Sequence, residues 1–300
     1  RMHRPGKAWN PGCWCFSDRL PKESGLVRYD RGGHRHRRMS KKTITRLNAA
    51  PPGFGDAADE LTQDMFDSDI PVQHSHEYFT DEALGLYVGV WDTTDMIETA
   101  GPYPCDEFMW LLEGEAQIRN CRSGAMERAV AGEPFVIPAG YECQWHQSGY
   151  LRKFFLIYEN PAEPVPEQPA VEGILIPRSD DPMKPLPSAD PFAPQDPSVQ
   201  QNQFISYQNH SGTFQAGVWE TGPFVSNESS FPCYQLGHVI EGVLTLIDHD
   251  GAEHCFGPGD TLFVPEGVLC SAFAEEKVRL FFARVTTKNK ETRDVDTPAH

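Results

Sequence analysis

The sequence lacks long apolar runs, and its mean hydropathy of -0.49 leaves no candidate for a membrane-spanning helix. Cysteine is sparse for a secreted disulfide scaffold, with 8 residues in 300, and no signal-peptide core is visible. Positive charge is also scarce: 26 Lys and Arg against 43 Asp and Glu give a formal charge of -17. We therefore expect a cytoplasmic protein that binds neither nucleic acid nor anionic membrane surfaces.

The few basic residues are concentrated at the N-terminus. Residues 1–38 are Arg-rich and show no strand or helix periodicity, whereas the remainder of the chain is strongly acidic. Met39 is followed by SKKTITRL, which has the composition of an ordinary protein start. We expect residues 1–38 to be a non-native or disordered extension, with a transit peptide as the alternative.

The two halves of the chain share three segments in the same order. They are GVWDT and GVWET (89–93 and 217–221), YPCDEF…LLEG and FPCYQL…VIEG (103–114 and 231–242), and GEPFVIPAGYEC…RKFF and GDTLFVPEGVLC…RLFF (132–155 and 259–282). The copies are 128 residues apart for the first two segments and 127 for the third. Ordered landmarks with a single gap indicate a duplicated domain.

Short apolar segments separated by turn residues predict β-strands in each copy. In the first copy they fall near 84–92, 106–112, 115–121, 133–137, 142–146 and 151–158. The predicted organisation is an N-terminal arm (39–83), a first barrel (84–159), a Pro-rich linker (160–203), a second barrel (204–286) and a tail (287–300).

The arm and the linker are expected to contribute little regular structure. The arm is polar and interrupted by turn residues, so His74 and His76 are interpreted as exposed side chains ahead of the first strand. Proline is too dense in the linker for central strands. Within it, GILIP (173–177) could add an edge strand to a barrel.

The Gly-acid-x4-Pro-x-Gly pattern, preceded by a strand ending in Leu-Glu-Gly, resembles the two motifs of the cupin superfamily. The chain resembles in particular the cupin group that includes ureidoglycine aminohydrolase and the ethanolamine-utilisation cupin, strongly over 84–158 and moderately over 214–285. That group has a Trp after the Pro-x-Gly turn and a Lys about eight residues later, matched here by Trp145 and Lys153. The resemblance implies an all-β bicupin of two tandem double-stranded β-helix (jelly-roll) barrels, and a homodimer.

The resemblance also implies ligand positions for a divalent metal, namely His-x-His, a Glu and a third His. In the first barrel these positions are Gly101, Tyr103, Glu107 and Cys143, and in the second Ser229, Phe231, Gln235 and Cys270. Because most ligands are replaced, we expect no cofactor. The alternatives are Zn or Mn held by Cys105, Glu107 and Cys143, or a disulfide between the two cysteines.

The candidate chemistry lies in the first barrel. Glu107, among aromatic residues, is the candidate general acid or base, with Lys153 holding a substrate anion. The alternative is a structural pair between the two. In the second copy these positions are Gln235 and Leu280, and Trp145 is replaced by Ala272. Four further first-barrel residues are predicted to contact the ligand: Tyr103, Cys105, Cys143 and Trp145.

These observations give three functional hypotheses. The first is binding of a small polar metabolite, carboxylate-like or amide- and ureide-like, in the first barrel, with metal-independent hydrolase or lyase chemistry. The second is a non-catalytic sensor or scaffold with degenerate metal sites. The third is a metal-dependent enzyme similar to ureidoglycine aminohydrolase, with Cys and Glu ligands.

Overall fold

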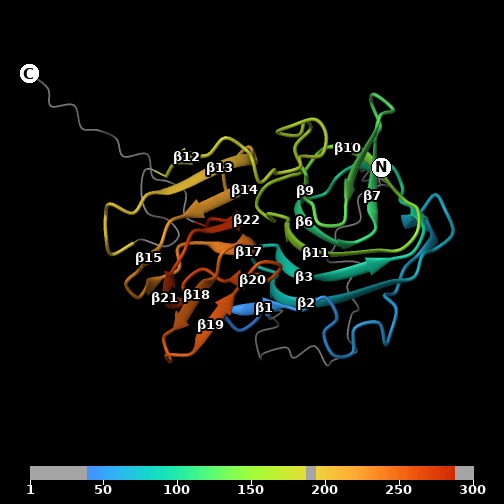
Figure 1. Cartoon of the computed structure of the whole chain (residues 1–300). Coiled ribbons are helices and arrows are strands. Elements are labelled where there is room, and N and C mark those ends of the chain that lie inside the picture. Colours follow the sequence, from blue (N-terminus) through green and yellow to red (C-terminus); the bar gives the residue numbers. More distant parts are fainter. Residues whose placement is uncertain (1–38, 187–193, 288–300) are drawn as a thin grey trace, which may run out of the picture.

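The computed structural model describes residues 39–186 and 194–287, so the predicted N-terminal extension and nearly all of the predicted tail lie outside the described residues. The described chain is almost entirely β-strand, and two barrels lie side by side (Figure 1). Its helical element is a single 3-10 turn at Gln63–Met65, within the segment DAADELTQDMF. None of the helical structure described is long or apolar enough to cross a membrane.

The first barrel consists of two facing sheets. One has the order β2 (Gln73–Asp81), β3 (Leu86–Thr93), β11 (Leu151–Tyr158), β6 (Asp106–Glu113) and β9 (Pro134–Ile137). The other has β4 (Met96–Ile97), β10 (Glu142–Gln147), β7 (Glu115–Asn120) and β8 (Met126–Val130), with β5 (Gly101–Pro102) also paired with β10. The strands predicted from short apolar segments are confirmed here, and β8 was missed.

The second barrel repeats this arrangement. Its larger sheet runs β1 (Thr45–Leu47), β20 (Thr261–Val264), β17 (Tyr234–Glu241), β22 (Val278–Val285), β14 (Phe214–Thr221), β13 (Gln201–Gln208) and β12 (Lys184–Pro185). Its smaller sheet runs β15 (Phe224–Val225), β21 (Leu269–Ala274), β18 (Leu244–Asp248) and β19 (Glu253–Phe256), with β16 (Ser229–Ser230) beside β21. The duplication is confirmed, and so are the two tandem jelly-roll barrels implied by the cupin resemblance.

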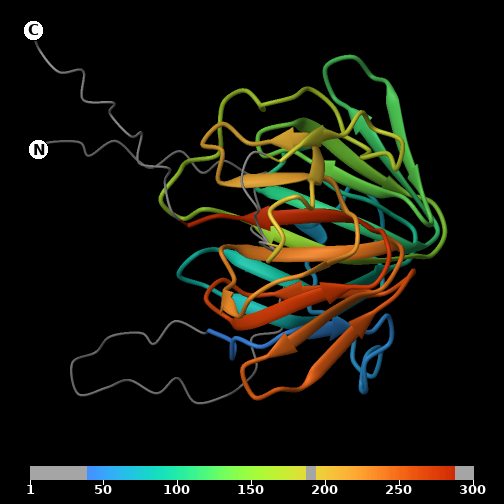
Figure 2. The ribbon, with the colours of Figure 1, turned by 60° about the vertical axis from the view of Figure 1, so that its left-hand side comes forward.

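The larger sheets of the two barrels pack against each other, which creates three apolar cores. One core fills each barrel, and the third lies between the barrels, where strands far apart in the sequence come together (Figure 2). On β6, Met109 and Leu111 enter the first barrel, whereas Phe108 and Trp110 enter the core between the barrels. Side chains alternate across a strand, so a strand buried on both faces is apolar throughout.

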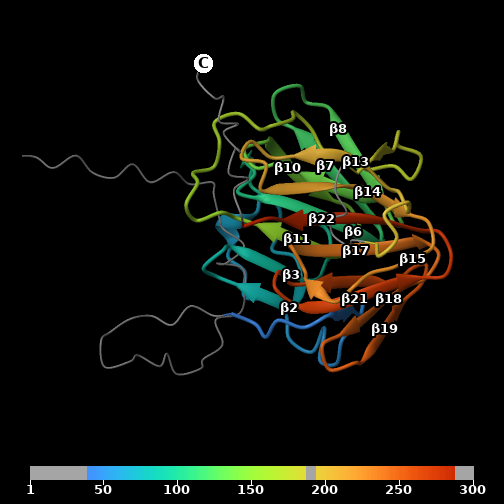
Figure 3. The same ribbon diagram turned by 90° about the vertical axis from the view of Figure 1, so that its left-hand side faces the viewer.

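The segments ahead of the two copies cross to the opposite barrel. In the arm, β1 pairs with β20 of the second barrel (Figure 3). In the linker, Leu175 exchanges two backbone hydrogen bonds with Val136 of the first barrel, at 2.8 and 3.0 Å. The edge strand anticipated at GILIP is therefore a single bridge.

The expectation of an irregular arm with two exposed histidines is wrong. Both His74 and His76 lie on β2, which pairs along its length with β3. They are half-buried, and Nδ1 of His74 is 2.7 Å from Oδ1 of Asp92. The strand was missed because its sequence, QHSHEYFTD, carries few of the apolar residues by which strands are recognised.

The glycine of the shared GVW segment has a steric function in both copies. A β-bulge in the neighbouring strand brings a carbonyl oxygen close to Gly89 in the first barrel and to Gly217 in the second. A Cβ placed on Gly217 would lie 1.9 Å from the carbonyl oxygen of Phe204, and one on Gly89 would lie 2.4 Å from that of His76. Only a residue without a Cβ fits this approach.

We therefore expect Gly217→Ala to lower the free energy of unfolding by about 1–3 kcal/mol, because backbone must move to admit the methyl group. Gly222→Ala is the control, since a Cβ there meets no atom within 4 Å. Urea denaturation of both variants measures the difference. Equal midpoints for the two variants would contradict a steric role for the shared glycine.

Candidate functional site

Two neighbouring strands place an ion pair inside the first barrel. β6 and β11 are antiparallel neighbours, and both Glu107 and Lys153 project inward from them. Nζ of Lys153 lies 2.7 Å from Oε1 of Glu107, and the two side chains are only 4% and 3% exposed. The ion pair considered as the alternative for these residues is thus present, with the ammonium of Lys153 in contact with the Glu107 carboxylate.

The ammonium of Lys153 is enclosed by aromatic rings. It lies 4.7 Å from the ring centroid of Trp91 and 4.8 Å from that of Trp145, and Sδ of Met109 is 3.0 Å from Nζ. Desolvated cation–π contacts of this kind stabilise a buried cation. The group-typical Trp and Lys, together with the Trp of the shared GVW segment, therefore form one unit around the charge.

Tyr103 completes the chain of polar groups. Its hydroxyl donates to Oε2 of Glu107, so both carboxylate oxygens have a donor. Burial and the neighbouring charge of Glu107 raise the pKa of Tyr103 well above its usual value. The phenol is therefore protonated at neutral pH and connects Glu107 to the next space outward.

That space is a small cavity at one end of the barrel. Its volume is about 40 Å³, room for about three water-sized groups, and its walls include Tyr103, Cys143 and Trp145. Glu98 also lines this cavity, and the sequence analysis did not identify it. Neither Glu107 nor Lys153 lines the cavity, but each contacts a residue that does: Tyr103 for Glu107 and Trp145 for Lys153. The remaining predicted ligand contact, Cys105, lines a different and larger cavity.

The proposed Cys–Glu metal set is not assembled. Among residues 39–186 and 194–287, no three His, Cys, Asp or Glu side chains are grouped closely enough to hold a metal ion, and this includes Cys105, Glu107 and Cys143. No disulfide joins Cys105 to Cys143, which overturns the disulfide alternative. Burial raises the pKa of Cys143 far above its usual value, which opposes the thiolate that a metal requires.

The conventional cupin metal does not fit the first barrel either. Of the four ligand positions, Glu107 alone carries a metal-binding carboxylate, and its partner is the ammonium of Lys153 at 2.7 Å. A cation is thus already supplied by the chain at the one carboxylate that the metal would need.

The second barrel has a different interior. Ala272 and Leu280 belong to its apolar core, and Gln235 is buried where the first barrel has Glu107. It contains neither the buried ion pair nor the aromatic enclosure that surrounds Lys153. The polar constellation is confined to the first barrel, in the part of the chain that the structure describes.

Comparison with known proteins agrees with this architecture. The EutQ-like cupin domain family model matches residues 208–282, the second barrel. The chain has the cupin fold in two tandem barrels. The family match falls on the copy in which the sequence resemblance was the weaker one, and its boundaries agree with the barrel from the end of β13 to β22. A search of curated proteins returned no match.

Solved structures share the bicupin fold at low sequence identity. A protein of unknown function from Pseudomonas syringae pv. tomato aligns with a TM-score of 0.65 and 21% identity, over 82% of this chain and 100% of its own. A variant of the salicylate 1,2-dioxygenase from Pseudoaminobacter salicylatoxidans, in complex with gentisate, aligns with a TM-score of 0.50 and 11% identity, over 83% and 84% of the two chains. Such similarity establishes the fold and leaves the chemistry to the site itself.

Proposed function

We propose that this bicupin binds a small amide- or ureide-like group at the cavity of the first barrel. The observation that supports the proposal is the hydrogen-bonded series Lys153–Glu107–Tyr103, which ends at the cavity wall. The Tyr103 hydroxyl donates inward to Glu107, which leaves its oxygen lone pairs able to accept a hydrogen bond from a ligand. A cavity of about 40 Å³ accepts the end of a metabolite rather than a whole large substrate.

The charges favour a neutral ligand over a carboxylate. Glu98 and Glu107 bring two carboxylates to this end of the barrel, and Lys153, behind the wall, is already paired with one of them. An added anion would be repelled by the excess negative charge. An amide or ureide instead offers N–H donors to acceptor oxygens and keeps its own carbonyl for a donor or water.

Binding without turnover is the role that the geometry favours, as in a small-molecule sensor. Acid–base hydrolysis or elimination is the second candidate, because Tyr103 is the one group that touches both Glu107 and the cavity and could pass a proton between them. Incubation of the purified protein with ureides and analysis for ammonia or cleaved product separates the two roles.

The test of binding compares acetamide, urea and small ureides with acetate. We expect the neutral compounds to quench Trp fluorescence, since Trp145 lines the cavity, and acetate to bind at least tenfold more weakly.

Tyr103→Phe, which reproduces the Phe231 of the second copy, removes one hydrogen bond and should weaken binding about tenfold. Tyr150→Phe is the matched control, since Tyr150 is exposed and bonds to Asp92 outside the cavity. Equal affinities for all three proteins, or a preference for acetate, would refute the proposal.

A further inference from the structure

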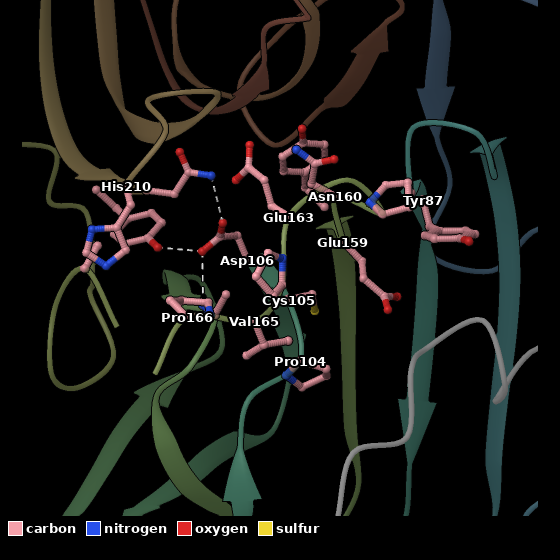
Figure 4. A pocket seen from close by; sticks show the side chains of 18 of the residues that line it. Tyr87, Pro104, Cys105, Asp106, Glu159, Asn160, Glu163, Val165, Pro166 and His210 are labelled. Atoms are coloured by element: carbon pink, nitrogen blue, oxygen red, sulfur yellow. Dashed lines mark hydrogen bonds between the residues drawn. The ribbon is translucent and has the colours of Figure 1, made fainter. Parts of the chain in front are cut away.

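A second and much larger cavity lies where the two barrels meet. Its volume is about 640 Å³, within the range of ligand-binding pockets, and the segment that follows β11 covers it. Residues of the first barrel, among them Tyr87 and Asp106, form one side, and Tyr207 and His210 of the second barrel form the other (Figure 4). Pro104 separates it from the small cavity of the first barrel and lines both.

A buried carboxylate at its base is held by three donors. Oδ1 of Asp106 accepts from the Tyr207 hydroxyl at 2.5 Å and from the backbone N–H of Ala139 at 3.0 Å. Oδ2 accepts from the side-chain amide of Asn209 at 3.0 Å. Burial raises the pKa of Asp106, because it disfavours the ionised carboxylate. A positive charge nearby would stabilise that ionised form. The donors fix the position of the carboxylate across the barrel interface.

The equivalent place on the other side of the interface has no such group. Tyr234 occupies the position 128 residues after Asp106, and Phe79 the position 128 residues before Tyr207. These two rings pack directly, with centroids 5.7 Å apart, in the apolar core between the barrels. At one of these two equivalent positions the barrels meet through packed aromatic rings. At the other, the Asp106–Tyr207 hydrogen bond lies beside the cavity.

The rest of the lining supplies negative charge and aromatic surface. Glu82, Glu159 and Glu163 join Asp106, and the described lining residues include no Lys or Arg. Figure 4 shows Glu159 and Glu163 on the segment that covers the cavity. Tyrosine rings and several prolines provide apolar walls. Carboxylates combined with aromatic faces are the groups that recognise organic ammonium ions.

We propose that the cavity between the barrels binds an organic ammonium ion with a short aliphatic body. The ammonium groups face the carboxylates of Asp106, Glu159 and Glu163, and the methylene chain lies against the tyrosine and proline walls. This site is separate from the one proposed in the first barrel and takes a cation, whereas the first-barrel site takes a neutral ligand.

The experiment titrates the full chain with 1,4-diaminobutane by calorimetry, alongside 1,4-butanediol and succinate as neutral and anionic molecules of the same chain length. We expect the diamine to bind at least tenfold more tightly than either. The double variant E159Q/E163Q should lose at least tenfold in affinity, because two rim carboxylates are neutralised without change of shape. Glu167→Gln removes one exposed acid on the same segment but outside the lining, and should change affinity less than twofold.

Several results would overturn the proposal. They are equal affinity for diamine and diol, an unchanged affinity in E159Q/E163Q, or a loss in Glu167→Gln as large as in the double variant, which would indicate general attraction to an acidic protein. Tyr103→Phe is expected to leave diamine binding unchanged. A variant that weakens ureide binding and leaves diamine binding unchanged distinguishes the two sites.

Discussion

Replacing Lys153 with Leu is expected to lower the free energy of unfolding by about 3–5 kcal/mol, since the Glu107 carboxylate would remain buried without its ammonium. Glu107→Gln should have a comparable effect by leaving the Lys153 ammonium buried and unpaired. The two partners are 2.7 Å apart and almost completely enclosed, so neither charge can escape to water. Chemical denaturation of both single variants gives the two values.

The second barrel provides the double variant that tests this coupling. Glu107→Gln with Lys153→Leu reproduces the Gln235 and Leu280 pair that the second barrel already contains. We expect the double variant to be more stable than the sum of the single changes predicts, by about 2–3 kcal/mol. Additive effects in the cycle would mean that the pair is not coupled.

An exposed ion pair serves as the matched control. Nη1 of Arg178 lies 3.2 Å from Oε1 of Glu133, but the two side chains are 57% and 27% exposed. Arg178→Leu should change stability by less than about 1 kcal/mol, because solvent screens the charge that remains. A large effect there would show that the Lys153 result reflects loss of long side chains rather than burial of a charge.

Much of the fold followed from local pattern. β3, β6 and β11 are buried on both faces and are recognisable as short apolar runs, and the duplicated copy provides a second instance of each. β8, MERAV, was missed because only Ala129 of its five residues is buried, as expected of an edge strand. β1 was missed because it is three residues long and its partner lies in the other barrel.

The site was accessible to sequence reasoning only where its residues share a strand or a motif. Glu107 and Lys153 were found through their places in the motifs of the cupin resemblance. The hydrogen bond between Asp106 and Tyr207 spans 101 residues and joins the two barrels, so no local sequence pattern predicts it. Its one sequence signal is a mismatch between copies, Asp106 against Tyr234, and that is informative only once the interface is known.

Acidification should weaken the protein through His238, which lies at the interface between the barrels. Its ring is stacked on Trp110 of the first barrel at a centroid distance of 3.6 Å, and Nδ1 is 2.8 Å from the Thr261 hydroxyl. Burial lowers the pKa of His238 to about 4. The unfolded chain, with an ordinary His pKa of about 6.5, therefore binds the proton first. Stability from the neutral ring is complete above pH 6.5 and is lost as the pH falls towards 4, by about 3 kcal/mol in total.

The variant His238→Phe isolates this contribution. It retains a ring against Trp110 and loses the titrating group, so its stability should fall less steeply than that of the unmodified protein between pH 6.5 and 4. Burial raises the pKa of Asp106, so this carboxyl instead adds stability as the pH falls. The contribution is the same in both proteins and cancels when their stabilities are subtracted. His249→Phe, at an exposed position, should leave the profile unchanged. Urea midpoints measured at several pH values provide the test, and parallel curves for His238→Phe and the unmodified protein would contradict it. Because Trp110 and His238 come from different barrels, a loss on acidification would also show that the barrel interface, rather than either barrel alone, sets the acid stability of the molecule.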